Sequence, residues 1–127
     1  MRPAERFVAF NAVGALGAGV QIASLAALTA FAHVHYAIAT TVAVGIAVVH
    51  NFFWHRYWTW RDRRAAVRPA LVRFVVTNGA VSLIGNMAVM TTLVSGAHVP
   101  AVPANVVSIA VCGLVNFVLG DAVVFRR

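Results

Sequence analysis

The sequence contains no lysine, and its only acidic residues are Glu5, Asp62 and Asp121. Charged residues make up 10% of the 127 residues and hydrophobic residues 61%, whereas a soluble domain has about a quarter charged and about half apolar residues. The apolar stretches recur along the whole chain and leave no polar segment long enough to fold separately. This composition excludes a soluble globular domain and predicts a small, single-domain integral membrane protein.

Several transport mechanisms lack the residues that they need. All three acids lie at the ends of hydrophobic stretches, so no carboxylate sits near the bilayer centre to relay a proton or to pair with a cation. A proton-coupled small-molecule exporter is therefore disfavoured. The chain also lacks the G-x-x-x-x-G-K-S/T loop that holds ATP phosphates, so movement of a substrate would be passive or coupled by another component.

Signs of an enzyme or a metal site are equally scarce. Serine, histidine and aspartate do not occur at spacings that assemble a nucleophile with its base. The single cysteine, Cys112, excludes an intrachain disulfide and is expected to be a small packing residue. His33 and His35 have no carboxylate or thiolate beside them to complete a metal site, and we expect His50 and His55 to cap or snorkel. The sequence predicts no catalytic residue, metal or cofactor.

Four hydrophobic segments are long enough to cross a bilayer core of about 30 Å at about 1.5 Å per residue. We therefore predict an all-α integral membrane protein with four transmembrane helices. The first segment ends in an Ala-Phe-Ala tripeptide that resembles a signal-peptide cleavage site, but its apolar run is too long for one. The predicted segments are residues 7–32, 36–54, 74–97 and 101–120.

The ten arginines, which give a net charge of +7, predict the orientation in the membrane. They precede the first segment, fill the loop between the second and third, and follow the fourth, while the other two loops contain none. By the positive-inside rule, both termini and the middle loop are cytoplasmic. A nucleic-acid partner is excluded because the arginines lie at segment ends rather than on a soluble face. They are Arg2, Arg6, Arg56, Arg61, Arg63, Arg64, Arg68, Arg73, Arg126 and Arg127.

Aromatic residues gather in the middle loop beside these arginines. Tyr57, Trp58 and Trp60 suit an aromatic belt at the level of the inner lipid headgroups, with arginines reaching anionic phosphates just beyond it. Anchoring of the chain in the membrane explains the same pattern without any ligand, and both interpretations stay open.

The chain also contains an internal repeat. RFVAFNAVG at Arg6 returns as RFVVTNGAV at Arg73, and Asn51 with the following phenylalanine matches Asn116 with its own. Each repeat holds two helices, so both repeats have the same orientation and are related by an axis along the membrane normal.

The repeat divides the single membrane domain, residues 1–127, into three parts. The first repeat covers residues 6–61, the connector residues 62–72 and the second repeat residues 73–126.

Small residues at every fourth position predict how the helices pack. Such ridges allow helix backbones to approach closely, which favours helix association in lipid. We interpret them as the internal helix interface. The two ridges are Ala39, Ala43, Ala47, Asn51 and His55 in the second segment, and Ala104, Ser108, Cys112, Asn116 and Gly120 in the fourth.

Amides in or at the ends of the segments have two possible roles. They form either a polar groove for a hydrophilic group or hydrogen bonds between helices, which contribute about 0.6 kcal/mol each on average. The residues are Asn11, Gln21, Asn51, Asn78, Asn86 and Asn116.

The motif NFFWHRYWTW at residues 51–60, with RF near the start of the chain, resembles the GtrA-like family of small bacterial membrane proteins. In that family the first half typically ends in N-F-x-x-N-R-x-W-T-F, and the second half ends in a shorter echo, here NFVLGDAVVF. Two positions depart from the pattern. His55 replaces a common asparagine, and Asp121 occupies the position equivalent to Arg56, where it would partner that arginine instead of binding phosphate.

The resemblance implies translocation of a polyprenyl-phosphate-linked sugar across the bacterial cytoplasmic membrane, for glycosyltransferases that decorate polysaccharide. Arginine suits such a role because its planar fork of donors matches phosphate oxygens. We expect Arg56 to be the leading phosphate ligand, followed by Arg6 and Arg73. The expected polar path or sugar-binding residues are Asn51, Asn116, Asn11, Asn78 and, by stacking on the sugar ring, Trp58.

The sequence leaves an alternative of another class open. In that alternative, the chain is a membrane adaptor that recruits or anchors a glycosyltransferase and transports nothing itself. We expect a homo-oligomer in either case, because four short helices make a thin wall around a lipid-linked substrate. The identity of the sugar and of the acceptor polysaccharide does not follow from the sequence.

Overall fold

A computed structural model describes residues 1–63 and 65–126 of the chain, and the regular structure in this part is entirely helical. Within it, four helices are long and apolar enough to cross a membrane: Pro3–Ala30, Ala37–Thr59, Val67–Gly96 and Pro103–Val124. The prediction of an all-α protein with four membrane-spanning helices is confirmed. Arg64 and Arg127, which belong to the arginine set used to predict orientation, lie outside the described residues.

Helix α1, Pro3–Ala30, begins earlier than the sequence predicts. Proline fits its first position because the N–H that proline lacks would have no partner there. Glu5 then accepts a hydrogen bond from the backbone N–H of Arg2 at 3.1 Å, which satisfies a donor at the helix start. As a consequence Arg6 lies inside the first turns of the helix, not in a tail before it.

Helix α2, Tyr36–Trp54, has the predicted bounds, but the chain stays helical beyond them. The ring nitrogen Nδ1 of His35 accepts the N–H of Ala37 at 3.3 Å and caps the helix start. The π-helix η1, His55–Thr59, directly continues α2. The predicted middle loop therefore starts about five residues too early, and Tyr57 and Trp58 lie on a helix.

The second half of the chain also contains two long helices, the first of which is made of several segments. Helix α3, Val67–Ala80, runs without a break through η2, Val81–Gly85, then α4, Asn86–Met90, and η3, Thr91–Gly96. Its start at Val67 is seven residues before the predicted segment at residue 74. Helix α5, Ala101–Leu119, then continues into the π-helix η4, Gly120–Val124.

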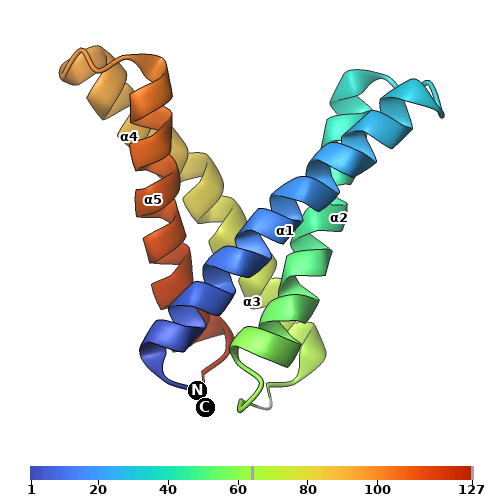
Figure 1. Ribbon diagram of the computed structural model, residues 1–127, viewed down its shortest axis with the longest axis vertical. Helices are drawn as coiled ribbons and strands as arrows, with labels where there is room; N and C mark the ends of the chain where they lie inside the picture. The colour runs from blue at the N-terminus through green and yellow to red at the C-terminus, as the bar shows by residue number, and fades with distance from the viewer. Residues whose placement is uncertain (64, 127) are drawn as a thin grey trace. The chain divides into compact units, whose positions relative to one another are not determined.

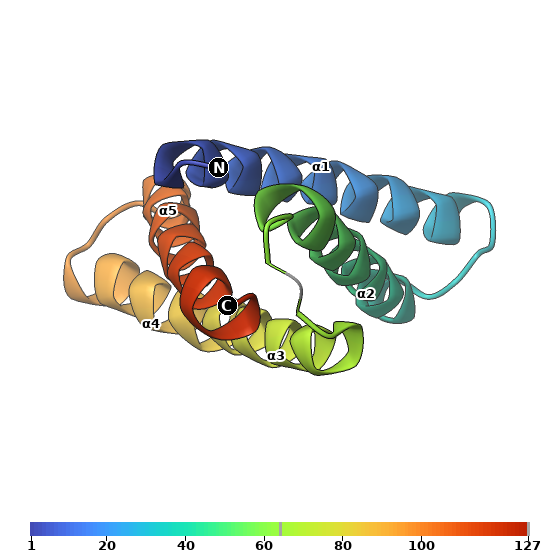
Figure 2. The same ribbon diagram turned by 90° about the horizontal axis from the view of Figure 1, so that it is seen from below.

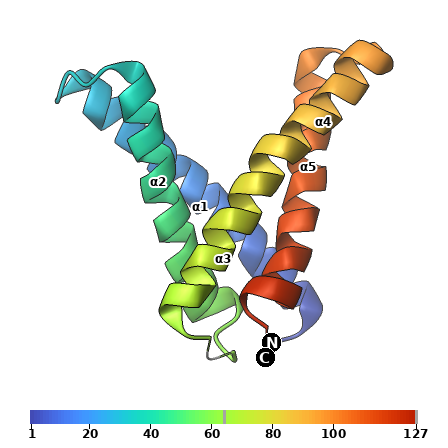
Figure 3. The ribbon, with the colours of Figure 1, turned by 180° about the vertical axis from the view of Figure 1, so that it is seen from behind.

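The helices form two compact units, unit 1 (Met1–Arg64) and unit 2 (Ala65–Arg127). In unit 1, α1 and α2 lie side by side and run antiparallel (Figures 1 and 2). In unit 2, the long helix from α3 to η3 returns through α5, and α4 packs against α5 (Figure 3).

The two turns that join the helix pairs share an unusual backbone. His33 has φ 52° and His98 has φ 55°, in the left-handed region where histidine is enriched among non-glycine residues. The residue after each histidine closes the turn, because Val34 N–H donates to Leu28 O at 3.0 Å and Val99 N–H donates to Leu93 O at 2.8 Å. The same bonds thus occur 65 residues apart.

The ridges of small residues are buried within the two units. In α2, Ala39 and Ala43 are fully buried and Ala47 is 5% exposed. In α5, the corresponding ridge of Ala104, Ser108 and Cys112 is buried too. Hydrophobic burial cannot drive helix association in lipid, so the helices have to associate through close packing of their backbones. The prediction that these ridges form the internal helix interface is confirmed.

The outward faces of the helices carry large apolar side chains. Ile22 is 69% exposed, Phe31 85% and Leu83 68%. Soluble proteins rarely expose continuous apolar surface of this kind. These faces are therefore the ones that contact lipid when the helices span a membrane.

Candidate functional site

An ion pair fixes Arg6 at the arginine-rich end of unit 1. Its Nη2 lies 2.5 Å from Oδ2 of Asp62, which follows η1. The Arg6 side chain is only 9% exposed and that of Asp62 is 36% exposed. The structure thus gives Arg6, predicted as a phosphate ligand, a carboxylate partner that joins the start of α1 to the end of the second helix.

The electrostatics of Asp62 follow from this contact. Partial desolvation alone would raise the pKa of the Asp62 carboxyl, but a hydrogen bond with its own backbone and the charge of Arg6 outweigh it. The pKa of Asp62 therefore lies below its ordinary value. The carboxylate is ionised at neutral pH and available to hold Arg6.

Aromatic rings from α1 and from the end of the second helix also pack together. The Phe10 ring stacks on His55 with centroids 4.8 Å apart, and Trp60 meets both rings edge-on at 6.1 and 5.4 Å. Nδ1 of His55 lies 3.1 Å from Oγ1 of Thr59. These contacts make the cluster a connection between α1 and the end of the second helix.

Two predictions are wrong at this cluster. Trp60 has no exposed surface, so it does not belong to a belt at the headgroups. His55 is 3% exposed, so the snorkelling alternative is wrong, whereas its place as the C-cap residue of α2 agrees with the capping alternative. The reason is that the π-helix His55–Thr59 continues α2 beyond its predicted end. His55 lies in this π-helix, Trp60 directly follows it, and both rings contact Phe10 of α1.

Arg56 and Trp58, the other predicted site residues of η1, are half-buried. The guanidinium carbon of Arg56 lies 5.9 Å from the centroid of the Tyr57 ring, within the range of a cation–π contact. Trp58 contacts Trp54 edge-on at 6.0 Å. It also lines a pocket of about 380 Å³ whose other lining residues are Met1, Ala4, Glu5, Val8 and Ala9.

Asn51 lies in the packed interface between α1 and α2, where its amide covers the backbone of Gly17. A Cβ atom at position 17 would overlap the Asn51 side chain. Oδ1 of Asn51 also lies 3.2 Å from Nδ1 of His50. Asn51 therefore has a partner within its own unit. Its amide fits because the residue opposite it on α1 is a glycine.

In unit 2, polar and small residues link α4 and η2 with α5. Ser108 Oγ donates a short hydrogen bond to Oδ1 of Asn86. Cys112 Sγ lies 3.8 Å from the carbonyl oxygen of Val81, and a Cβ at Gly85 would lie 3.0 Å from the same sulfur. The expected packing role of Cys112 is confirmed.

Asn116, one turn further along α5, differs from these residues. Its Oδ1 is buried, and among the described residues it has no hydrogen-bond partner. A buried amide oxygen without a donor is unfavourable by about 1–3 kcal/mol. Oδ1 of Asn116 therefore favours a hydrogen bond from a donor that is not a side chain of unit 2.

The remaining predicted site residues are placed as follows. Asn11 is exposed, and its Nδ2 donates to the Phe7 carbonyl of its own helix at 2.7 Å. Arg73 and Asn78 are half-buried on α3. Asp121, on η4, belongs to unit 2 whereas Arg56 belongs to unit 1, so their pairing stays a prediction.

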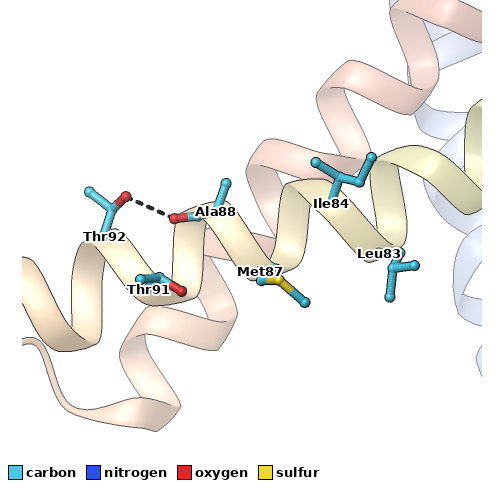
Figure 4. Close-up of a pocket in the computed structure, with 6 residues that line it drawn as sticks. All are labelled: Leu83, Ile84, Met87, Ala88, Thr91 and Thr92. Atoms are coloured by element: carbon cyan, nitrogen blue, oxygen red, sulfur yellow. Dashed lines mark hydrogen bonds between the residues drawn. The ribbon is translucent and has the colours of Figure 1, made fainter.

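Two further observations on the described residues concern metal ions and ligands. Among them, no group of three or more histidine, cysteine, aspartate or glutamate side chains is placed to hold a metal ion. A pocket of about 480 Å³ lies along the long helix of unit 2 (Figure 4). Four of its six lining residues are Leu83, Ile84, Met87 and Ala88. The hydrogen bond that Figure 4 marks among these residues lies within the helix, where Thr92 Oγ1 donates to Ala88 O at 2.8 Å. This lining fits a lipid-facing surface.

The sequence also contained signals that the predictions leave unused. Ala9, Val13 and Gly17 are buried on α1 at a spacing of four, the same pattern that marked the second and fourth helices. Asp62, two residues after the motif at residues 51–60, carries no predicted role although it pairs with Arg6. The predicted set of membrane amides omits Asn105, whose side chain is exposed on α5.

A comparison with family models identifies the kind of protein that has this arrangement. The model described as GtrA/DPMS, transmembrane domain, matches residues 9–125. No curated protein matches the sequence. The matched range contains most of α1 and all of the other helices, and it confirms the resemblance carried by the motifs after α2 and α5.

Proposed function

The chain belongs to the GtrA/DPMS transmembrane-domain family, and we propose that it translocates a polyprenyl-phosphate-linked sugar across the bacterial cytoplasmic membrane. Family membership indicates a multi-pass membrane protein involved in membrane processes of polyprenyl-phosphate-linked sugars. Translocation is the finer step of the proposal. The sugar would then serve glycosyltransferases that modify cell-surface polysaccharide.

The observation that carries the proposal is the polar content of the buried helix seams. In unit 2, Asn86 and Ser108 are hydrogen-bonded to each other between two membrane-spanning helices, and Asn116 on the second of these helices has a buried Oδ1. Sugar hydroxyls lose their water in the membrane and need donors and acceptors in its place. Neutral amides and hydroxyls provide them without placing a charge in the bilayer.

The arginines at one end of the helices suit the phosphate of the same substrate. Arg56 is half-buried at the end of the second helix, beside Tyr57 and close in sequence to Trp58. Its fixed charge and planar donors match a phosphate at headgroup depth. With the cytoplasmic orientation that the arginine distribution predicts, this end meets the lipid-linked sugar where it is made.

The proposal includes partners but no bond-making chemistry. The chain itself carries out no reaction, and a membrane glycosyltransferase uses the sugar after translocation. We propose a homo-oligomer, because two helix pairs alone provide little protein surface around a long polyprenyl chain. The polyprenyl tail stays in the bilayer.

Proteoliposomes test the proposal directly. We expect purified wild-type protein to speed the translocation of a short-chain, fluorescent polyprenyl-phosphate-sugar analogue above the rate in protein-free vesicles. Arg56→Ala should reduce the rate at least tenfold, because the phosphate loses a charged donor. Arg68→Ala removes the same charge from an exposed position at the start of α3 and should leave the rate unchanged.

The amide path is tested in the same vesicles. Asn116→Leu keeps the approximate side-chain shape but removes the amide, whose oxygen is buried without a donor among the described residues, and it should also slow translocation. Asn11→Leu is the matched control, since the Asn11 amide is exposed and bonded to its own helix. If wild-type protein that is shown to be folded gives no acceleration, translocation is contradicted and recruitment of a glycosyltransferase becomes the better account.

A further inference from the structure

Residues at equivalent positions of the predicted repeat have different contacts in the two units. In the predicted repeat, Arg6 corresponds to Arg73 and Asn51 corresponds to Asn116. All four are predicted contacts for the lipid-linked sugar, so the sequence alone assigns both repeats the same role. The structure separates them, and the inference drawn from this separation rests on the proposed function.

In unit 1 the two polar side chains are occupied by the protein itself. Arg6 is buried and held by Asp62 at 2.5 Å. The amide of Asn51 packs over Gly17, and its Oδ1 lies 3.2 Å from His50 Nδ1. Binding of a phosphate or a sugar at either residue would first have to break these contacts.

In unit 2 the equivalent side chains have no such occupants. Arg73 is half-buried and, unlike Arg6, forms no ion pair within the described part of the chain. The Nε atoms of both arginines are buried without an acceptor there, so the ion pair is the difference between them. Oδ1 of Asn116 is buried and lacks a donor among the same residues. The sequence agrees with the difference at the arginine. The offset of 65 residues between Asn51 and Asn116 aligns Asp62 with residue 127, which is an arginine and has no side-chain carboxylate.

We propose that, of these four residues, Arg73 and Asn116 of unit 2 bind the lipid-linked sugar, with Arg73 contacting the phosphate and Asn116 contacting the sugar, while Arg6 and Asn51 of unit 1 have structural roles. The chemistry of each group matches the assignment. The Arg73 guanidinium donates hydrogen bonds and charge to phosphate oxygens. Oδ1 of Asn116 is an acceptor, so a sugar hydroxyl supplies the donor that it lacks.

The positions of the two residues indicate the order of their contacts. Phe74, next to Arg73, packs against Phe125 with ring centroids 6.4 Å apart, which places Arg73 near the end of the second unit's last helix. Asn116 lies nine residues before Phe125, or about 13 Å along the helix. Arg73 therefore meets the phosphate at the membrane surface, and Asn116 meets the sugar deeper in the bilayer.

Binding measured in detergent separates this inference from translocation. The probes are a short-chain polyprenyl phosphate with and without its sugar, and competition by phosphatidylglycerol distinguishes a specific site from general attraction to anionic lipid. Arg73→Gln should weaken the binding of both probes at least tenfold. Asn116→Leu should weaken only the probe that carries the sugar, because the phosphate contact remains.

The equivalent substitutions in unit 1 are the matched controls. Arg6→Gln and Asn51→Leu should lower the thermal stability of the purified protein and leave the affinity of its folded fraction within about twofold, a difference of about 0.4 kcal/mol. Equal losses of affinity in both units, or a loss in unit 1 alone, would overturn the inference. So would complete displacement of the probes by phosphatidylglycerol. Specific binding without translocation in vesicles would instead contradict the proposed function and leave the assignment to unit 2 intact.

Discussion

Gly17 has less room for a side chain than the other glycines of α1. Its backbone lies under the amide of Asn51, and any side chain at this position overlaps that amide. Gly14 and Gly19, on the same helix, have open space where a Cβ would be. The three glycines therefore allow a comparison in which the helix and the substitution are constant and only the packing differs.

We predict that Gly17→Ala destabilises the protein by about 1–3 kcal/mol, the range for overpacking of a close-packed interface. Gly14→Ala and Gly19→Ala should be neutral or slightly stabilising, because alanine is the better helix former. Thermal unfolding of the purified proteins in detergent measures the difference. Adding Asn51→Ala to Gly17→Ala should recover part of the loss, and no recovery would show that the amide is not the obstacle.

The Arg6–Asp62 ion pair gives a second prediction for single residues. Asp62→Asn leaves a buried arginine without its carboxylate, which we expect to cost about 1–2 kcal/mol, between the values for exposed and buried pairs. Glu5→Gln is the control, because the Arg2–Glu5 pair is exposed and contributes little. Equal effects of the two substitutions on thermal stability would contradict the structural role of Asp62.

The same pair predicts a dependence on pH. Because the pKa of Asp62 is lowered in the folded protein, its contribution is fully present above the ordinary value of 3.8. It is lost as the pH falls from there through the lowered pKa. The stability difference between wild type and Asp62→Asn should therefore be constant near neutral pH and shrink under acid conditions. A difference that grew on acidification would contradict this assignment.

At the scale of helices, the sequence predicts the spans well and their ends poorly. Hydrophobic length gave all four spans, and the bounds of α2 at residues 36 and 54 match. Two arginines and a proline within residues 67–73 hid the first turns of α3, because hydropathy records lipid contact and not helix formation. The π-helices at 55–59 and 120–124 depend on how the last turns pack, which no local pattern in the sequence records.

The candidate site shows the same division between what could and could not be predicted. Spacing by four identified the ridge of α2 and the position of Asn51 on it. It could not show that Asp62 returns to Arg6, because that contact joins residues 56 positions apart. Burial of Trp60 was missed for a related reason, since tryptophan occurs in interfacial belts as well as in protein interiors.

The different burial of the tryptophans on either side of η1 can be tested by fluorescence quenching. Trp60 is fully buried whereas Trp54 is 44% exposed. In variants that each retain one tryptophan, with phenylalanine at the other two positions, Trp60 should be quenched by acrylamide several-fold less than Trp54. Similar quenching of both, in protein that retains its helical circular dichroism, would place Trp60 at the surface and contradict the aromatic cluster.

For the whole molecule, the orientation in the membrane is the prediction on which the proposed direction of substrate entry depends. In a Cys112→Ala background, Ala32→Cys lies in the turn after α1 and Ala66→Cys lies just before α3, and both alanines are exposed. In intact cells, a membrane-impermeant maleimide should label position 32 and not position 66. The reverse labelling pattern would contradict cytoplasmic termini.

The central claim concerns what the four helices do together, and translocation by the wild-type protein tests it most directly. The measurement is the rate at which a fluorescent polyprenyl-phosphate-sugar analogue crosses the bilayer of proteoliposomes that contain only this chain. We expect a rate that rises in proportion to the amount of folded protein per vesicle. A rate equal to that of protein-free vesicles at every protein density would contradict it.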